Sequence, residues 1–136
     1  MLKHNIIEGL TTTFQKETNY ADSFSTNQSM SLDFLVSTPA VLNMIIQASG
    51  KFLDDLIPME YITVGKNIEL SHEHPTLIGS TVSIIIKVVK VENNIISLEI
   101  AGYDEEGIFC KGKHDRAIIK REKLIEIAYK RTPNIS

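Results

Sequence analysis

Two residues of this sequence carry groups suited to carbonyl chemistry, the hydroxyl of Thr38 and the imidazole of His72. A neutral imidazole, with an ordinary pKa of about 6.5, can take up a proton near neutral pH. A hydroxyl can hold a water molecule or a carbonyl group, and it can attack a carbonyl carbon once a neighbouring base activates it. If the fold brings them together, the two groups could handle a carbonyl compound.

Each of these residues also has a purely structural explanation. Ser37 and Thr38 stand directly before Pro39, so either hydroxyl can cap a helix, which stabilises the fold by about 1 kcal/mol. His72, at the end of a strand-like segment, can equally be a surface or hydrogen-bonded structural histidine. Capping does not exclude catalysis, and both interpretations remain open at this stage.

The clearest helix pattern follows Thr38 and covers residues 40–57, with Pro58 just past its end. Apolar side chains recur at helical spacing in two adjoining stripes, Val41, Ile45, Ala48, Phe52 and Leu56 in one and Leu42, Ile46, Ser49 and Leu53 in the other. The opposite face is polar, with Asn43, Gln47, Lys51 and Asp54. A helix of about eighteen residues spans roughly 27 Å, so it should form the axis of a small domain.

The other elements are strands, expected at residues 10–18, 61–70, 76–91, 95–103 and 108–120. Residues 19–32 are polar and suit an irregular connection or lid. Turn residues at 92–94 and 104–107 make the last three strands an antiparallel meander. Because no crossover helices separate the later strands, the sequence predicts an α+β fold with an antiparallel sheet of about five strands around one long helix.

The composition limits the function classes. The 136 residues suit one domain, 1–136, with a few frayed residues at each end, and a net charge of -3 disfavours nucleic acid as a partner. No apolar stretch reaches bilayer length, and no secretory segment starts the chain, so we expect a cytoplasmic protein without a membrane partner. The lone Cys110 should be a small core residue, and no metal-ligand spacing occurs. The open sheet edges favour a homodimer and leave a tetramer open.

Four short motifs in order resemble the hotdog thioesterases related to fluoroacetyl-coenzyme A thioesterase. They are Ser37-Thr38-Pro39-Ala40, Thr63-Val64-Gly65, His72 followed by Thr76 and Gly79, and Gly112-Lys113-His114-Asp115-Arg116. The resemblance runs from about Leu35 to Ile119. It implies a hotdog fold and hydrolysis of a small acyl-CoA thioester, with coenzyme A as part of the substrate and no separate cofactor. It also implies that Thr38 and His72 are catalytic.

The family's catalytic group includes a third residue, a Glu two turns into the helix, and this position falls on Ile46. Ile46 can be neither nucleophile nor base. A one-residue slip would place Gln47 there, where it could position water, although Gln47 belongs to the polar face. Glu73 and His74 are other candidates for a displaced acid or base, but neighbours in a strand point to opposite faces.

The resemblance also suggests substrate-binding residues, namely Gly65, Arg116, Ile46, Gln47 and Phe34. The family's matching Arg lies near the acyl site, so Arg116 could contact a carbonyl or phosphate, whereas alternation places Lys111 and Lys113 on a solvated face. Strand glycines such as Gly65 are explained about as well by bulges. Phe34 is our aromatic candidate near the expected lid, where the resemblance to the fluoroacetate-specific enzyme implies a pair of aromatic residues, and we do not expect fluoroacetyl specificity from it.

Two functions therefore remain, because the carboxylate is missing at Ile46. The first is an acyl-CoA thioesterase that works slowly or with a substitute carboxylate. The second is a non-hydrolytic protein that binds or senses an acyl-CoA. Hydration or dehydration of an acyl thioester is a related option, since hotdog folds host both chemistries, but it would usually need an acid on the helix.

Overall fold

A computed structural model describes residues 2, 4–23 and 32–132 of the chain. The elements follow one another as β1 (Thr11–Glu17), a short 3-10 helix (Tyr20–Asp22), α1 (Thr38–Asp54), β2 (Tyr61–His72), β3 (Thr81–Glu92), β4 (Ile95–Asp104), β5 (Gly107–Lys120) and α2 (Arg121–Arg131). The expected α+β class, with one long helix and five strands, is confirmed. No helix of the described residues is long and apolar enough to cross a membrane.

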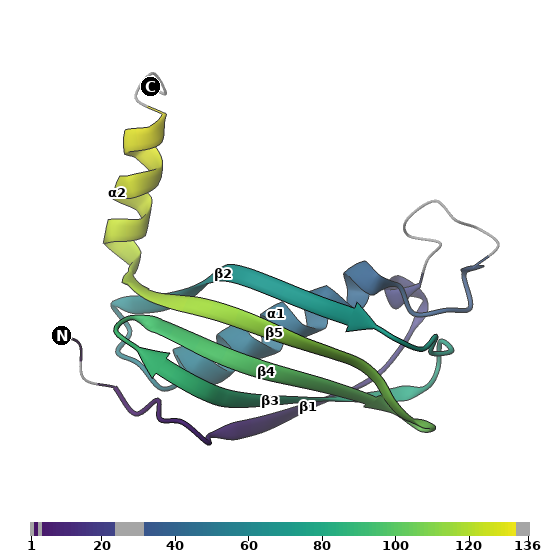
Figure 1. Ribbon diagram of the computed structural model, residues 1–136. Helices are drawn as coiled ribbons and strands as arrows, with labels where there is room; N and C mark the ends of the chain where they lie inside the picture. Colours follow the sequence, from purple (N-terminus) through teal and green to yellow (C-terminus); the bar gives the residue numbers. More distant parts are fainter. Residues whose placement is uncertain (1, 3, 24–31, 133–136) are drawn as a thin grey trace.

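The five strands form one antiparallel sheet in the order β1-β3-β4-β5-β2. The predicted meander is present, because β3, β4 and β5 are neighbours joined by tight turns. The sheet curves around α1, which runs along its inner face (Figure 1). This arrangement leaves β1 and β2 as the two edge strands.

The first turn of α1 separates the roles of two adjacent hydroxyls. Ser37 is the N-cap, and its Oγ accepts a hydrogen bond from the backbone N–H of Ala40 at 3.1 Å. Pro39 occupies the first turn, where its missing N–H costs no intrahelical bond. Thr38 therefore does not cap the helix, and its side chain is available for another contact.

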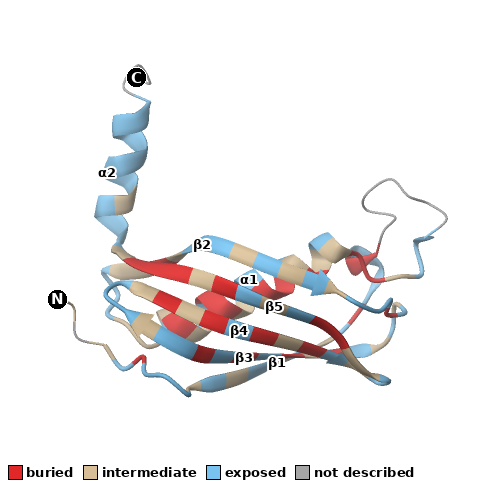
Figure 2. Ribbon diagram, viewed as in Figure 1, coloured by how far each residue is buried: buried red, intermediate tan, exposed pale blue. Residues whose placement is uncertain are grey.

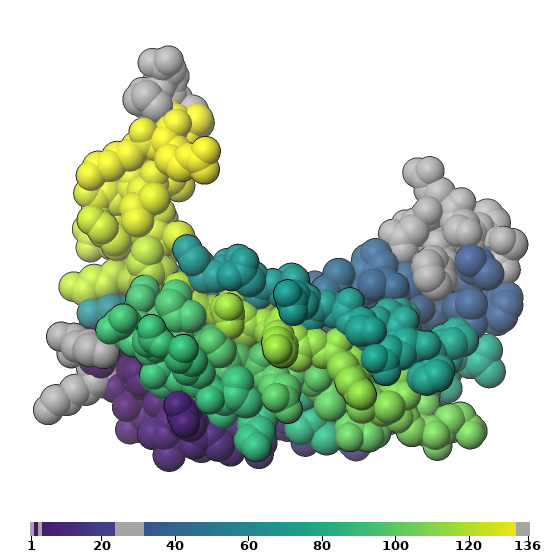
Figure 3. Space-filling model, in the orientation of Figure 1, coloured from purple at the N-terminus to yellow at the C-terminus, as the bar shows by residue number. Residues whose placement is uncertain are grey.

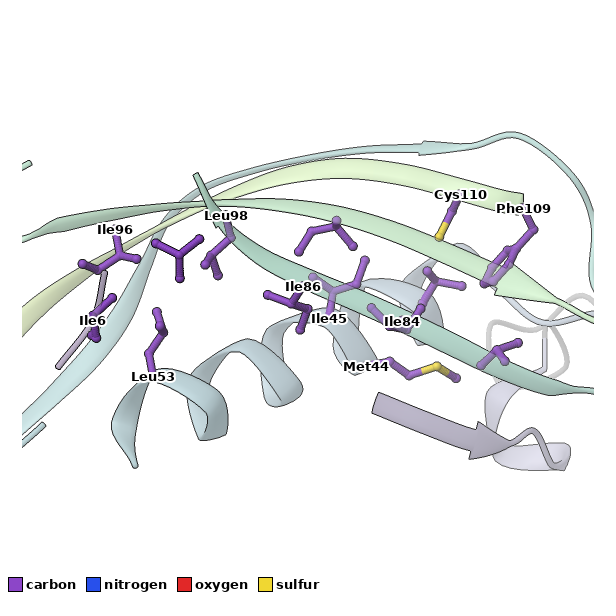
Figure 4. Packing of buried hydrophobic residues seen from close by; sticks show 14 of the residues in the cluster. Ile6, Met44, Ile45, Leu53, Ile84, Ile86, Ile96, Leu98, Phe109 and Cys110 are labelled. Atoms are coloured by element: carbon purple, nitrogen blue, oxygen red, sulfur yellow. The ribbon is translucent and has the colours of Figure 1, made fainter. Parts of the chain in front are cut away.

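The core lies between α1 and the inner face of the sheet (Figure 4). Ile45 and Leu53 of α1 face Ile84, Ile86 and Leu98 of the sheet, all fully or almost fully buried. Each such side chain contributes about 1.5–3 kcal/mol on burial. The buried stripe of α1 comprises Val41, Met44, Ile45, Ser49, Gly50 and Leu53.

This stripe corrects part of the helix prediction. Met44 is buried although neither predicted stripe included it, while Ile46 is 41% exposed. The helix is oriented so that Val41, Ile45 and Leu53 face the sheet. Ile46 follows Ile45 by one residue, so its side chain points about 100° away from that face. The helix also ends earlier than expected, because Leu56 N–H bonds Leu53 O in a closing turn.

The segment before β3 also differs from the sequence prediction. The strand begins at Thr81 instead of residue 76, because Gly79 adopts a φ of +97° and Ser80 N–H bonds Leu77 O in a turn. Thr18 fixes this turn, since its Oγ1 accepts from Gly79 N–H and donates to Ser80 O. Within the expected lid at 19–32, residues 24–31 lie outside the described part of the chain.

Helix α2 was not predicted at all. It follows β5 directly and projects from the body of the molecule (Figure 1), and its surface is almost entirely exposed (Figure 2). None of its eleven residues is buried. Because no face of α2 packs on the core, the sequence carries no strong apolar periodicity there.

Candidate active site

The fold brings Thr38 and His72 into direct contact. Thr38 begins α1 and His72 ends β2, and the Oγ1 of Thr38 lies 2.7 Å from Nδ1 of His72. The position of His72 is set by pairing of β2 with β5, where Cys110 is its partner. The hydroxyl and the imidazole of the sequence hypothesis therefore form one hydrogen-bonded pair.

The surroundings of His72 favour its neutral form. Its ring is half-buried and meets Phe109 edge to face, with 5.9 Å between ring centroids. Burial lowers the pKa of His72 below the ordinary 6.5, and the nearby backbone of His74 only partly opposes this effect. Its Nε2 is buried without a hydrogen-bond partner among the described residues. One ring nitrogen is thus held by Thr38 and the other is uncommitted.

A cavity of about 280 Å³ opens beside this pair. It is lined by Leu35, Val36, Thr38, His72, Glu73, His74 and Pro75. Glu73 and His74 follow β2 directly, and the backbone N–H groups of both donate to the carbonyl of Phe109. This shared contact ends the strand and turns both residues toward the cavity, so strand alternation does not separate them. The cavity therefore has a carboxylate at its wall.

Larger hollows lie elsewhere on the molecule. One of about 720 Å³ is lined by residues near the N-terminus, among them His4, and by residues 55–58. Another, of about 530 Å³, is formed by β2, β4 and β5 and includes Glu69, Glu99, Lys111 and Lys113. Its charged side chains are of both signs, and no imidazole lines it. We assign the candidate site to the smaller cavity because, among the described residues, only there are a hydroxyl and an imidazole joined by a hydrogen bond.

Ile46 and Gln47 do not line this cavity. Both are exposed in the single chain, and the amide of Gln47 donates to Asn43 Oδ1 at 3.3 Å. The only acidic residue of α1 is Asp54, at the other end of the helix. Helix α1 therefore supplies no carboxylate to the Thr38–His72 pair.

Arg116 belongs to a separate buried cluster near the end of α1. It is only 6% exposed, and its Nε and Nη2 donate to the side-chain and backbone oxygens of Thr63 at 2.9 and 2.7 Å. Thr63 in turn donates from both N and Oγ1 to Asp54 Oδ1 at 2.8 Å. Gly50 makes room for the guanidinium, since a Cβ there would lie 3.2 Å from Nη2.

His114 completes this cluster. Its Nδ1 lies 2.9 Å from the carbonyl oxygen of Asn67, which can only accept, so Nδ1 carries the proton. Nε2 then accepts from Arg116 Nη1 at 3.2 Å. Burial is the main cause that lowers the pKa of His114, and the nearby guanidinium acts in the same direction. The guanidinium of Arg116 is thus already engaged on three sides, away from the Thr38–His72 cavity.

The remaining predicted residues lie around these two groups. Gly65 is beside His114, where a Cβ would make an ordinary contact of 3.4 Å, so close packing does not demand glycine there. Phe34 is exposed next to the cavity-lining Leu35. Lys111 and Lys113 are solvated, as alternation predicted. Cys110 is a fully buried core residue, and burial raises its pKa to about 11.

Sequence reasoning did not identify Asp54 and Thr63 as partners of Arg116, or Phe109 as the neighbour of His72. Asp54 was assigned to the polar face of the helix, and Phe109 carried no motif. The Thr63-Val64-Gly65 motif was the one available signal for Thr63. Among the residues that the structure describes, no group of three or more His, Cys, Asp or Glu side chains could hold a metal ion.

Comparison with known proteins places this geometry in a family. The family model described as fluoroacetyl-CoA-specific thioesterase matches residues 16–122, which contain the Thr38–His72 pair and the Arg116 cluster. A search of curated protein sequences found no match.

Solved structures share the fold over nearly the whole chain. A hot-dog-like protein from Thermanaerovibrio acidaminovorans is 26% identical, with a TM-score of 0.85 and 91% of each chain covered. A variant of the fluoroacetyl-CoA-specific thioesterase FlK is 17% identical, with a TM-score of 0.86 and coverage of 95% of this chain and 99% of that one. A thioesterase superfamily member from Thermus thermophilus is 19% identical, with a TM-score of 0.80 and coverage of 95% and 94%. The five-stranded sheet around one helix is therefore a hotdog fold, and the chain belongs to the fluoroacetyl-CoA-specific thioesterase family.

Proposed function

We propose that this protein hydrolyses a small acyl-CoA thioester at the cavity beside Thr38 and His72. The observation that carries the proposal is the 2.7 Å contact between the Thr38 hydroxyl and Nδ1 of His72 at the wall of that cavity. Membership of a thioesterase family supports the same reaction class. Acyl transfer to water needs a base for the water, a donor for the carbonyl oxygen and a proton for the leaving thiolate.

The pair can supply all three. Nδ1–H of His72 donates to Thr38 Oγ1, and the Thr38 hydroxyl then donates to the thioester oxygen. Nε2, which has no partner among the described residues, takes one proton from water as its oxygen attacks the carbonyl carbon. The tetrahedral intermediate then collapses, and Nε2–H returns the proton to the leaving sulfur, which releases free coenzyme A and the carboxylic acid. The lowered pKa of His72 keeps its base form available near neutral pH.

Glu73 is our candidate for the missing helix carboxylate. It lines the same cavity and is exposed, with its Oε2 accepting from Ser71 Oγ at a long 3.3 Å. This weak contact leaves the carboxylate free to orient the attacking water. Ile46 occupies the family position instead, and nothing on α1 competes for this role.

The proposed substrate has a small acyl group. The cavity volume of about 280 Å³ favours a short chain over a long one. Solved structures of the thioesterase FlK include complexes with acetyl-CoA and with fluoroacetate and coenzyme A. We carry over only the coenzyme A thioester, and the thiol-release test identifies the acyl group.

Thiol release is the direct test. The purified protein is incubated with short, medium and aromatic acyl-CoA thioesters while free thiol is recorded, with His72→Ala as the control. We expect release from at least one short thioester. Release no faster than that of the His72→Ala protein would refute the hydrolase.

The alternative is a non-hydrolytic protein that binds or senses an acyl-CoA. The residue that favours it is Ile46, in the place of the family carboxylate. This function predicts that thioesters raise the melting temperature of the protein without turnover. Absence of a shift with any thioester would exclude it.

A further inference from the structure

Strand β2 carries a bulge in its middle. Its pairing with β5 runs without a break up to Gly65, opposite Arg116, and resumes at Asn67, opposite Asp115, so Lys66 is the extra residue. The three residues of the bulge are exposed. The molecule is hollowed along this edge strand, between α2 and the beginning of α1 (Figure 3). The backbone ladder is therefore interrupted at an open edge of the sheet.

Two side chains of β5 hold β2 on either side of this bulge. Arg116 donates from Nε and Nη2 to Thr63, which precedes the bulge. His114 donates from Nδ1 to the carbonyl oxygen of Asn67, at the far side. Gly65 lies beside both groups, since a Cβ there would be 3.4 Å from Cε1 of His114 and 3.9 Å from Nη1 of Arg116. Side chains thus anchor β2 where its ladder is interrupted.

The two anchoring side chains are also bonded to each other. Nη1 of Arg116 donates to Nε2 of His114 at 3.2 Å, and this bond requires a neutral imidazole, because a protonated ring has no acceptor. Both side chains are buried, so a second positive charge is poorly solvated there. A proton on Nε2 would turn the hydrogen bond into a contact between two buried cations.

The groups packed around His114 do not neutralise a second cation. The strands on either side place apolar residues opposite it in register, Ile68 in β2 and Leu98 in β4. The charged groups nearby are Arg116 and Asp115 of β5 and Asp54 of α1. Asp115 is the next residue in the strand, so it points to the other face of the sheet. Asp54 already accepts two hydrogen bonds from Thr63.

The net effect on His114 agrees with this geometry. Burial is the main cause that lowers its pKa. The carbonyl of Asn67 raises the pKa, the guanidinium of Arg116 lowers it, and the carboxylate of Asp115 raises it. The closed arrangement therefore contains the neutral ring, and a proton is taken up more readily when the ring is released from it.

We propose that His114 is a pH-sensitive switch for β2, in which a proton on Nε2 breaks the bond to Arg116 and residues 65–67 separate from β5. Because the two side chains hold opposite sides of the bulge, the two cations move apart by releasing one anchor on β2. Strand β5 stays in place, since β4 pairs with it on its other side, whereas β2 has no second neighbour in the described chain. The proton comes from solvent and returns there when the pH rises. The switch needs no substrate and is independent of the proposed hydrolysis.

Hydrogen exchange locates the opening. Protection factors of backbone amides are measured at about pH 7.5 and pH 5, with the intrinsic pH dependence of exchange removed. A released imidazole has an ordinary pKa of about 6.5, so opening becomes more favourable as the pH falls below that value. We expect the amides that join β2 to β5 in residues 63–68 to lose about tenfold in protection at pH 5, while those between β3 and β4 keep theirs. An equal loss between β3 and β4, or no loss in β2, would overturn the proposal.

The variant His114→Gln assigns the effect to this imidazole. Glutamine offers Arg116 an acceptor but takes up no proton near neutral pH. We expect the amides of residues 63–68 in this variant to keep their protection at pH 5. The matched control is His72→Gln, which removes the other histidine with a lowered pKa, and we expect it to lose protection as the parent does. A loss in His114→Gln as large as that of the parent would overturn the proposal.

An NMR titration of the unsubstituted chain needs no variant to fold. The ring Cε1–H signal of His114 reports its protonation, and the amide signal of Asn67 reports the bulge. We expect both to change with one midpoint, below about pH 6.5. A midpoint of His114 at or above that value, or an Asn67 signal that does not follow it, would contradict the switch.

Discussion

The Oγ1 of Thr38 and the Nδ1 of His72 lie 2.7 Å apart although thirty-four positions separate the two residues in the chain. The contact depends on two element ends, the start of α1 and the end of β2. Because both ends are fixed by independent bonds, the pair is preorganised before any substrate arrives.

Removing either member should abolish most of the thiol release. We expect His72→Ala to lower kcat at least about a hundredfold, the usual contribution of a general base. Thr38→Val should lower kcat by a similar order, whereas Thr38→Ser retains the hydroxyl and most of the rate. Steady-state thiol release measures both effects, with the solvated Lys113→Ala as the control. Full activity in His72→Ala would place the chemistry elsewhere.

The pH profile should report the environment of His72. Since burial lowers its pKa, kcat/KM should rise with pH, reach half its maximum below pH 6.5 and stay level above. The same shift stabilises the fold above the unfolded pKa, and this contribution is lost as pH falls through the folded pKa. Thiol release measured across about pH 5 to 8 checks the sign. A midpoint above the ordinary value would contradict a buried neutral base.

Glu73 and Ile46 can be tested as a pair. We expect Glu73→Gln to lower kcat about tenfold or more, because the carboxylate that orients water is lost. Adding Ile46→Glu to that variant should leave kcat low, as should Gln47→Glu, because neither position lines the cavity. Unchanged kcat in Glu73→Gln would remove this residue from the proposed mechanism.

The Arg116 cluster should affect stability more than turnover. Thr63→Val removes the hydroxyl that accepts from Arg116 and donates to Asp54, which leaves the buried Nε–H of Arg116 unpaired. We expect the free energy of unfolding to fall by about 1–3 kcal/mol while KM changes little. Urea unfolding measures the first quantity and thiol release the second, with Thr63→Ser as the conservative control. A large rise in KM without loss of stability would instead make Arg116 a substrate contact.

Substitution of Ser49 is expected to raise the free energy of unfolding. Its hydroxyl is buried in α1 without a hydrogen-bond partner among the described residues. Ser49→Ala should therefore raise the free energy of unfolding by roughly 1 kcal/mol. Ser37→Ala, which removes the N-cap of the same helix, should lower it by about 1 kcal/mol. A loss of stability in Ser49→Ala would reveal a partner for this hydroxyl.

Local patterns predicted the elements well. The helix after Pro39 and the meander formed by β3, β4 and β5 depend on capping residues, apolar period and short turns, all readable within a few residues. The strand at Thr81 began later than expected because the turn at Gly79 depends on Thr18, a distant residue. Helix α2 was not predicted because none of its residues is buried in its own chain.

The site was predictable only in part, because some of its contacts join residues that are distant in the sequence. Thr38 and His72 were identified through a family resemblance; the structure places them in contact, and their catalytic role stays a prediction. The partners of Arg116 could not be anticipated, since Thr63 and Asp54 are brought together by packing of α1 on β2. Similarly, the rotation of α1 that exposes Ile46 and buries Met44 is decided by the sheet, beyond what helical spacing alone specifies.

The division of roles between Ser37 and Thr38 has a consequence for how this protein can change. Helix initiation depends on the first hydroxyl, and contact with the imidazole depends on the second. Substitutions at Thr38 can therefore alter the reaction without melting the helix that carries it. Two adjacent residues thus give this scaffold a position where new chemistries can be explored, by natural variation or by design, while the architecture stays intact.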